Sequence, residues 1–205
     1  MLEKGAPPEP DLFLASQQGI YDRVKQLLDS GENAATDRDA ENCTALHWAS
    51  INNHVRIAQL LIERGAQVDA TGGELLATPL HWATRSGHVQ IVSILHSAGA
   101  DLTLEDNQGY NALHLAAHAG NALMIVFLLA LGMDVNSLDT MGRTALMWSA
   151  YKGNSIDSLR ELLRAGAALD LVDQTGYSAL HWAVRVLESK SGTGKNPALI
   201  HFPFR

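Results

Sequence analysis

The strongest constraint in this sequence is a six-residue segment that returns five times at a nearly constant spacing. Its central leucine lies at positions 46, 80, 113, 146 and 180, which gives steps of 34, 33, 33 and 34 residues. A glycine at positions 31, 65, 99, 132 and 166 keeps the same period independently. Two markers with one period indicate a tandem array whose units bury their apolar faces against their neighbours.

Composition narrows the classes of function that such an array can have. The chain has 205 residues and a formal net charge of −7, which argues against nonspecific binding to nucleic acid. Its one cysteine, Cys43, excludes an internal disulfide framework and a multi-cysteine zinc site. The longest uncharged apolar run spans residues 122–133, whereas a membrane-spanning helix needs about 20 residues. We therefore expect no membrane span and no secretory signal.

Several repeated positions have a clear structural role. A threonine or its equivalent precedes the repeated leucine by two residues, where its hydroxyl can cap a first helix. The periodic glycine follows a second helix and supplies a left-handed residue there. A turn four residues before the leucine also needs a positive φ, and Leu76 occupies that place in one unit. The other units have residues suited to such a turn at this place: Asn42, Gly109, Gly142 and Gly176.

The motifs Thr-Pro-Leu-His-x-Ala, Gly-His and Leu-Leu-x-x-Gly-Ala at this period resemble those of ankyrin repeats. The resemblance implies an all-α ankyrin-repeat solenoid of about five to six helix-turn-helix units with short hairpin fingers. We expect a flexible N-terminus over residues 1–10 and a non-repeat tail over 185–205, which we interpret as an interrupted repeat. The predicted units are 11–38, 39–72, 73–105, 106–138, 139–172 and a partial unit at 173–184.

All four tryptophans occupy one place, two residues after the repeated leucine. At 100° per residue this place lies about 200° from the leucine, and so away from the core stripe of Leu46, Ala49 and Ser50. Because first helices line the concave surface of ankyrin arrays, the tryptophans could form a wall that binds an extended peptide. The alternative is that the indoles pack against neighbouring helices, and their number favours packing for most. The predicted peptide-binding residues are Trp48, Asn52, Trp82 and Ser86.

Catalytic, cofactor and metal sites are not expected. The periodic histidines His47, His81, His114 and His181 could suggest metal binding, but in ankyrin repeats this histidine hydrogen-bonds backbone and threonine groups and ties the units together. Cys43 has only His47 near it in sequence as a possible base, and that histidine already has a structural role. The segment 191–195 departs from the phosphate-loop pattern.

Longer segments carry a closer resemblance. Residues 46–53 (LHWASINN), 72–85 (GGELLATPLHWATR), 107–114 (NQGYNALH) and 144–151 (TALMWSAY) resemble the ankyrin domain of the DHHC palmitoyltransferases. The likeness is to the fungal type and extends to the huntingtin-interacting animal members. Those enzymes are membrane proteins of the Golgi and endosomal system and transfer palmitate from acyl-CoA to cysteines. This chain lacks the Asp-His-His-Cys centre on which the transfer depends.

The resemblance also implies a function for the array. In the animal members, the ankyrin domain recruits protein substrates through a short proline-containing motif, and its pocket corresponds to Asn52 and Trp82 here. We therefore expect a protein-interaction module that recruits substrates or adaptors, binds no nucleic acid, and works at the cytoplasmic face of Golgi or endosomal membranes when part of a full-length enzyme. The alternative is a free-standing ankyrin-repeat adaptor.

Overall fold

The computed structural model describes residues 9–153 and 155–191, and the chain divides into two compact units. Unit 1 comprises residues 1–115 and unit 2 comprises residues 116–205. Most of the predicted N-terminus and the tail from residue 192 onwards lie outside the described residues. The described helices are α1 (Leu12–Gln18), α2 (Tyr21–Asp29), α3 (Ala45–Ile51), α4 (Val55–Glu63), α5 (Pro79–Ser86), α6 (Val89–Ser97), α7 (Ala112–Ala119), α8 (Ala122–Ala130), α9 (Ala145–Lys152), α10 (Ile156–Arg164) and α11 (Ala179–Ser191).

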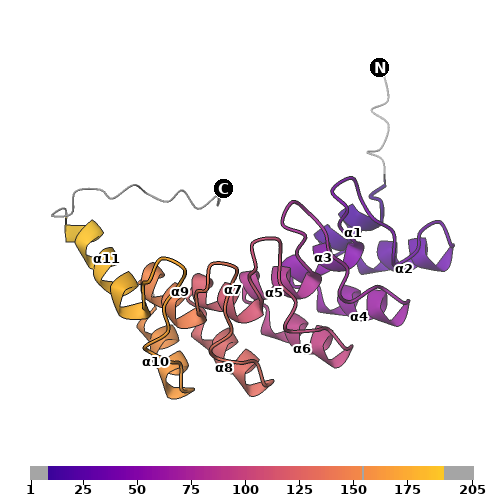
Figure 1. The fold of residues 1–205 in the computed structure, drawn as a ribbon. Helices are drawn as coiled ribbons and strands as arrows, with labels where there is room; N and C mark the ends of the chain where they lie inside the picture. The colour runs from indigo at the N-terminus through magenta and orange to yellow at the C-terminus, as the bar shows by residue number, and fades with distance from the viewer. Residues whose placement is uncertain (1–8, 154, 192–205) are drawn as a thin grey trace. The chain divides into compact units, whose positions relative to one another are not determined.

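Within each unit the helices pack as stacked pairs, as the period predicts (Figure 1). In unit 1, α1 packs on α2, α3 on α4 and α5 on α6, while the first helices α1, α3 and α5 also pack side by side. The second helices α2, α4 and α6 form a parallel row of contacts. In unit 2, α9 packs on α10 and on α11, and α8 packs on α10. The predicted all-α ankyrin-repeat architecture is therefore confirmed.

The helix ends follow from the residues identified in the sequence. Thr44 and Thr78 lie at the N-caps of α3 and α5, and each forms a reciprocal capping box with the histidine three residues later. Pro79 begins α5, where its missing N–H has no helical partner to lose. All five periodic glycines have positive φ, between 74° and 95°. The predicted caps and left-handed helix ends are confirmed.

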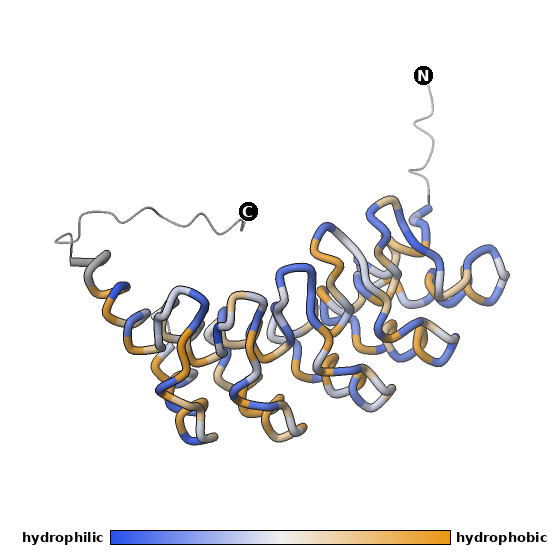
Figure 2. Tube along the Cα trace, viewed as in Figure 1, coloured by the Kyte–Doolittle hydropathy of each residue, from blue (hydrophilic) through white to orange (hydrophobic). Residues whose placement is uncertain are grey.

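The core lies between the helices of neighbouring repeats. The predicted stripe of Leu46, Ala49 and Ser50 is fully buried. Figure 2 shows apolar residues along the helices within each unit and hydrophilic residues at many of the loops between them. The repeated leucine is buried at positions 46, 80, 113 and 146, as expected where neighbouring repeats within a unit cover one another.

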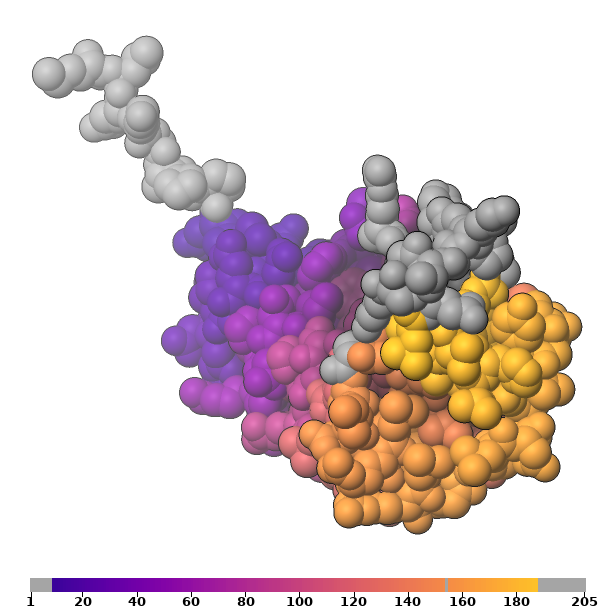
Figure 3. Space-filling view, turned by 90° about the vertical axis from the view of Figure 1, so that its left-hand side faces the viewer, coloured from indigo at the N-terminus to yellow at the C-terminus, as the bar shows by residue number. Residues whose placement is uncertain are grey.

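The last repeated leucine behaves differently. Leu180 on α11 is 71% exposed, and Val184 and Leu187 on the same helix are also exposed. Figure 3 shows α11 in yellow over the orange helices of unit 2. The helix continues to Ser191, past residue 184, where the sequence placed the end of the repeats. The division of the chain into repeats and tail stays a prediction.

The loops between repeats are the predicted hairpin fingers. The finger aspartate accepts the backbone N–H groups two and four residues ahead, as Asp39 does from Glu41 and Cys43 at 2.9 and 2.8 Å. Isolated antiparallel bridges close two of these fingers, between Arg38 and Thr44 and between Gly72 and Ala77. At the finger turn Asn42 has φ 62° and Leu76 has φ 48°, so Leu76 adopts the left-handed conformation that its position requires.

Candidate peptide-binding site

Two of the periodic histidines, His47 and His81, join one repeat to the next. The His47 Nδ1 atom accepts the Thr44 backbone N–H at 3.0 Å, so the ring proton lies on Nε2, which donates to the Ala77 carbonyl of the following repeat at 3.0 Å. His81 bonds Thr78 and the Leu104 carbonyl in the same way. Burial lowers the pKa of His47 to about 4 and also lowers that of His81. Both ring nitrogens are occupied, which confirms the predicted structural role.

Three of the four tryptophans are held by a finger aspartate. The indole N–H of Trp48 donates to Asp39 at 2.7 Å. Two further pairs repeat this contact at the same separation of nine residues: Trp148 with Asp139 at 3.0 Å, and Trp182 with Asp173 at 2.9 Å. This contact turns the indole toward the finger of its own repeat and satisfies its polar atom.

Trp82 is the exception. The residue nine places earlier is Gly73, which has no side chain to accept a hydrogen bond. Within the described residues the Trp82 indole nitrogen has no hydrogen-bond partner. The ring is half-buried and touches its neighbours edge-on, with its centroid 5.1 Å from that of His47 and 5.4 Å from that of Trp48. Trp82 therefore presents both an aromatic face and an unused donor.

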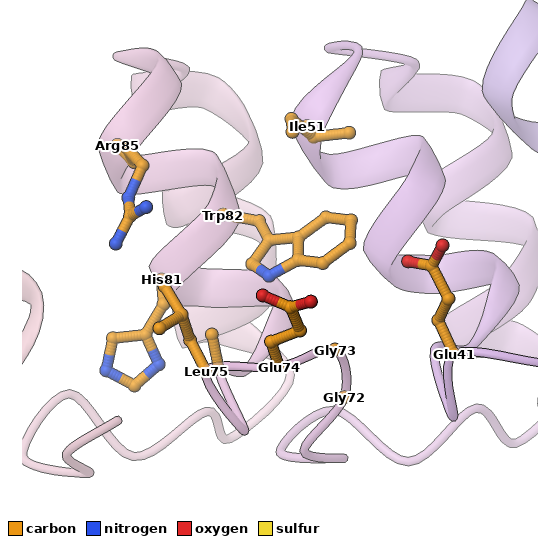
Figure 4. Close-up of a pocket in the computed structure, with 10 residues that line it drawn as sticks. Glu41, Ile51, Gly72, Gly73, Glu74, Leu75, His81, Trp82 and Arg85 are labelled. Atoms are coloured by element: carbon orange, nitrogen blue, oxygen red, sulfur yellow. The ribbon is translucent and has the colours of Figure 1, made fainter. Parts of the chain in front are cut away.

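A hollow of about 310 Å³ lies beside this indole in unit 1. We call it the Trp82 hollow. The indole projects across it between α3 and α5, with Ile51 on the α3 side and Leu75 on the finger side (Figure 4). The charged residues Glu41, Glu74 and Arg85 also line it. The hollow thus combines an apolar wall with an acidic finger edge.

The glycines at the base of the hollow allow two fingers to approach closely. The Gly73 backbone N–H donates to the Glu41 carbonyl at 3.0 Å. A Cβ atom on Gly72 would lie 2.8 Å from the Asn42 carbonyl oxygen and 2.9 Å from Cys43 Cα, so a side chain cannot be placed there without moving the backbone. Cys43 is buried beneath these fingers, and burial raises the pKa of its thiol to about 11. It therefore remains a neutral thiol at neutral pH.

In the next repeat the finger aspartate is present but the tryptophan is missing. Leu115 takes the tryptophan place there, and it lies nine residues after the finger aspartate Asp106. The Asp106 Oδ2 atom is buried and lacks a hydrogen-bond partner in the described part of the chain. Arg85 Nη2 approaches this oxygen at 4.0 Å from a side chain that is itself 44% exposed. The Arg85 side chain thus lines the Trp82 hollow and also lies beside the buried Asp106 carboxylate.

Unit 2 contains the equivalent hollow at Trp182, with a volume of about 200 Å³. Asp173 stands here at the place of Gly73 and accepts the indole N–H. Tyr177 stands at the place of Ala77, and its ring centroid lies 5.7 Å from that of Trp182. The Arg185 guanidinium lies over the same rings, 5.5 Å from the Trp182 centroid. Side chains of the protein itself therefore satisfy and partly cover Trp182, unlike Trp82.

The predicted site residues have different surroundings in the structure. Trp82 lines the hollow and Trp48 packs edge-on against it. Asn52 is exposed at the end of α3, next to Ile51, and its amide donates to the Trp48 carbonyl at 2.9 Å. Ser86 is exposed beside Arg85. Their role in binding a peptide stays a prediction.

Sequence reasoning did not find the other residues that line the hollow: Glu41, Gly73, Glu74 and Arg85. One signal was present, because the finger aspartates recur at 39, 106, 139 and 173 but not at 73. Trp148 and Trp182 are buried. For these two tryptophans the structure agrees with the packing alternative.

Models of the ankyrin-repeat family match nearly the whole described chain. A model of three ankyrin repeats matches residues 72–139 and 113–190, and a model of many repeats matches 12–62 and 46–96. The chain belongs to the ankyrin-repeat family. Since such repeats present stacked surfaces to other proteins, it is a protein–protein interaction module.

Curated relatives refine this assignment. The chain is 45% identical over 185 residues to palmitoyltransferase Hip14 of Drosophila melanogaster, a match that covers 87% of this chain and 29% of that protein. It is 44% identical over 175 residues to human palmitoyltransferase ZDHHC17, with 85% and 28% covered, and 56% identical over 105 residues to palmitoyltransferase AKR1 of Yarrowia lipolytica, with 51% and 15% covered. The chain thus spans less than a third of the length of these relatives.

The predicted resemblance to the ankyrin domain of palmitoyltransferases is confirmed by these matches, which do not favour the alternative of a free-standing adaptor. Among the helices of residues 9–191, none combines the length and apolar character that a membrane-crossing segment requires.

Proposed function

We propose that this chain recruits protein substrates for a protein S-palmitoyltransferase, and that the Trp82 hollow binds an extended, proline-containing segment of the substrate. The observation that carries this proposal is the half-buried Trp82 indole beside a hollow of about 310 Å³, with its N–H unpaired among the described residues. The palmitoyltransferase relatives supply the context, since each is named for the transfer of palmitate.

The chemistry of the hollow suits such a segment. Trp82, Ile51 and Leu75 offer apolar surface, and tryptophan contributes a large contact area at low entropic cost. A proline-containing segment is already extended before it binds, so less conformational entropy is lost on docking. Exposed Asn52 and Ser86 lie next in sequence to residues that line the hollow and can bond the backbone of the peptide.

As part of a longer enzyme, the module would work at the cytoplasmic face of Golgi or endosomal membranes. There it would hold a substrate close to the membrane-bound transferase centre. Because the recruited segment and the modified cysteine are separate, the linker between them sets the effective concentration of the cysteine at that centre.

The proposal can be tested with an array of peptides that carry one fixed proline. The tightest binder is then titrated by calorimetry against the wild-type chain, Trp82→Ala and Asn52→Ala. We expect Trp82→Ala to weaken binding by at least tenfold and Asn52→Ala by about threefold, the loss expected for one hydrogen bond.

Leu169→Ala provides a matched control, because Leu169 is an exposed apolar residue of unit 2 and is not among the residues that line the hollow. The affinity of Leu169→Ala for the peptide should equal that of the wild type. Circular dichroism establishes that each variant is folded. Equal affinities of the wild type, Trp82→Ala and Asn52→Ala would exclude this site, and no binding by any proline-containing peptide would exclude the proposed ligand.

A further inference from the structure

The Trp82 repeat lacks two groups that cover the tryptophan elsewhere in the chain. In the repeats of Trp48, Trp148 and Trp182, a finger carboxylate accepts the indole N–H. In the repeat of Trp182, the Tyr177 ring also packs against the indole. The corresponding residues beside Trp82 are Gly73 and Ala77, which are the smallest of the residues at these two places.

The missing carboxylate has a definite place. A Cβ atom built on Gly73 would lie 3.5 Å from Trp82 Cζ2, the ring carbon next to the indole Cε2–Nε1 edge. A longer polar side chain from this position would therefore meet the edge of the ring that carries the N–H. With glycine, no side chain from residue 73 fills this space, and the Glu74 carboxylate lies on the same side of the indole (Figure 4).

We propose that Gly73 determines specificity by leaving the Trp82 N–H available to a main-chain carbonyl of the bound peptide. This inference rests on the proposed function and adds the polar contact that fixes the position of the peptide. The carbonyl takes the place that Asp39, Asp139 and Asp173 occupy in their own repeats. Peptide binding at Trp82 thus completes a contact that the other tryptophans make internally.

The charges around the hollow favour a neutral acceptor over an anionic one. Glu41 and Glu74 line it from the fingers, and Arg85 faces the buried Asp106 carboxylate at 4.0 Å. Two carboxylates against one guanidinium make the charged lining of the hollow net negative. A carboxylate or phosphate would be repelled there, whereas a peptide carbonyl would not. The ligand class is therefore the backbone of a neutral or basic extended segment.

A first experiment observes the donor directly. In a 15N-labelled chain, the indole proton of Trp82 should exchange with water faster than those of the three hydrogen-bonded tryptophans. Titration with N-acetyl-L-proline methylamide, a minimal proline backbone, should move the Trp82 indole signal downfield and leave the other three in place. A protected Trp82 proton in the free chain would overturn the proposal.

A second experiment restores the missing acceptor. In Gly73→Asp the new carboxylate should take the indole N–H, and the affinity for the tightest proline-containing peptide should fall at least tenfold. Gly73→Ala is the matched control, because it adds the same Cβ atom at the same positive φ but no acceptor, and its affinity should remain within about threefold of the wild type. Equal losses in the two variants would show that only space matters and would overturn the proposal.

A third variant separates this inference from the proposed function. Trp82→Phe keeps an aromatic face and removes the N–H, so peptide affinity should fall about five- to tenfold. If Trp82→Ala abolishes binding while Trp82→Phe binds as tightly as the wild type, the hollow binds peptides without the hydrogen bond. That result would overturn the inference alone, and it does not depend on the folding of Gly73→Asp.

Discussion

Trp82 in unit 1 and Trp148 in unit 2 occupy the same place in their repeats but have different surroundings. Trp148 is 2% exposed, and its N–H bonds Asp139 at 3.0 Å. The Arg143 guanidinium lies 4.3 Å from its ring centroid. Trp82 is half-buried and its N–H has no acceptor in the described residues. One position in a repeat can therefore be fully covered in one unit and partly exposed beside a hollow in another.

The difference depends on the residues that contact the indole rather than on the indole itself. Where the finger supplies a carboxylate and large side chains cover the ring, the tryptophan stabilises the stack. Where the finger supplies glycine, the same ring remains available to a ligand. On the proposed function, a repeat array acquires a site by losing a contact, because its remaining repeats still provide a stable scaffold.

The largest expected effect tests this contrast directly. Trp148→Ala should lower the free energy of unfolding by about 3–5 kcal/mol, because it removes a fully packed aromatic side chain and leaves a cavity. Trp82→Ala should cost only about 1–2 kcal/mol, since that ring is only partly buried in the folded chain. Urea denaturation followed by circular dichroism measures both values. Equal costs for the two variants would contradict the contrast.

The next largest effect concerns pH, because acid should lower the free energy of unfolding through the buried histidines of unit 1. Folded His47 binds its proton only near pH 4, whereas the unfolded side chain binds it near pH 6.5. Between these values the unfolded state holds more protons, so the free energy of unfolding falls as the pH is lowered, by about 3 kcal/mol in total. Burial lowers the pKa of His81 in the same direction. Urea denaturation at a series of pH values from 7 to 4 measures this loss.

The control for this prediction comes from unit 2, where Met147 occupies the corresponding place. The His47→Met variant has no titrating side chain at position 47. It should be less stable than the wild type at pH 7, because methionine cannot make the His47 hydrogen bonds, but it should lose less stability between pH 6.5 and pH 4. A slope identical to that of the wild type would show that His47 does not cause the acid sensitivity.

The finger aspartates provide a third comparison. Asp139 accepts the Trp148 N–H and the buried Arg143 Nε at 2.9 Å, so Asp139→Asn should cost about 2–3 kcal/mol by opposing these donors with an amide N–H₂ group. Asp39→Asn should cost about 1 kcal/mol, because Trp48 is only half-buried and no buried arginine of the described residues shares that carboxylate. Thermal unfolding of both variants tests the ranking, and a larger cost at Asp39 would reverse it.

The smallest effect concerns the finger beside the hollow. Leu76 has φ 48° at the turn where Gly109, Gly142 and Gly176 lie in other repeats. Leu76→Gly should raise the free energy of unfolding by about 1 kcal/mol, because relief of the left-handed strain exceeds the added entropy of the unfolded chain. Chemical denaturation measures the change. A loss of stability would show that Leu76 is held by contacts that outweigh its strain.

Much of the fold could be predicted from spacing alone. The repeated leucine, the capping threonines and the left-handed glycines act within a few residues of the chain, so their roles could be read from local sequence. The position of Trp82 away from the core stripe also followed from the helical period. The burial of Trp148 could not be predicted in this way, because it depends on Arg143 and on neighbouring helices.

The sequence by itself determined the ankyrin architecture and the capped helix pairs. It also determined that each tryptophan points away from Leu46 and its equivalents on the first helix. Only the tertiary structure decided which tryptophan has both a hollow beside it and an indole N–H without an acceptor in the described residues. Local periodicity fixes the direction of a side chain on its helix, but solvent access depends on the groups that the adjacent finger brings against it. At Trp82 that group is Gly73, and its missing side chain becomes meaningful only once the finger is folded against the indole.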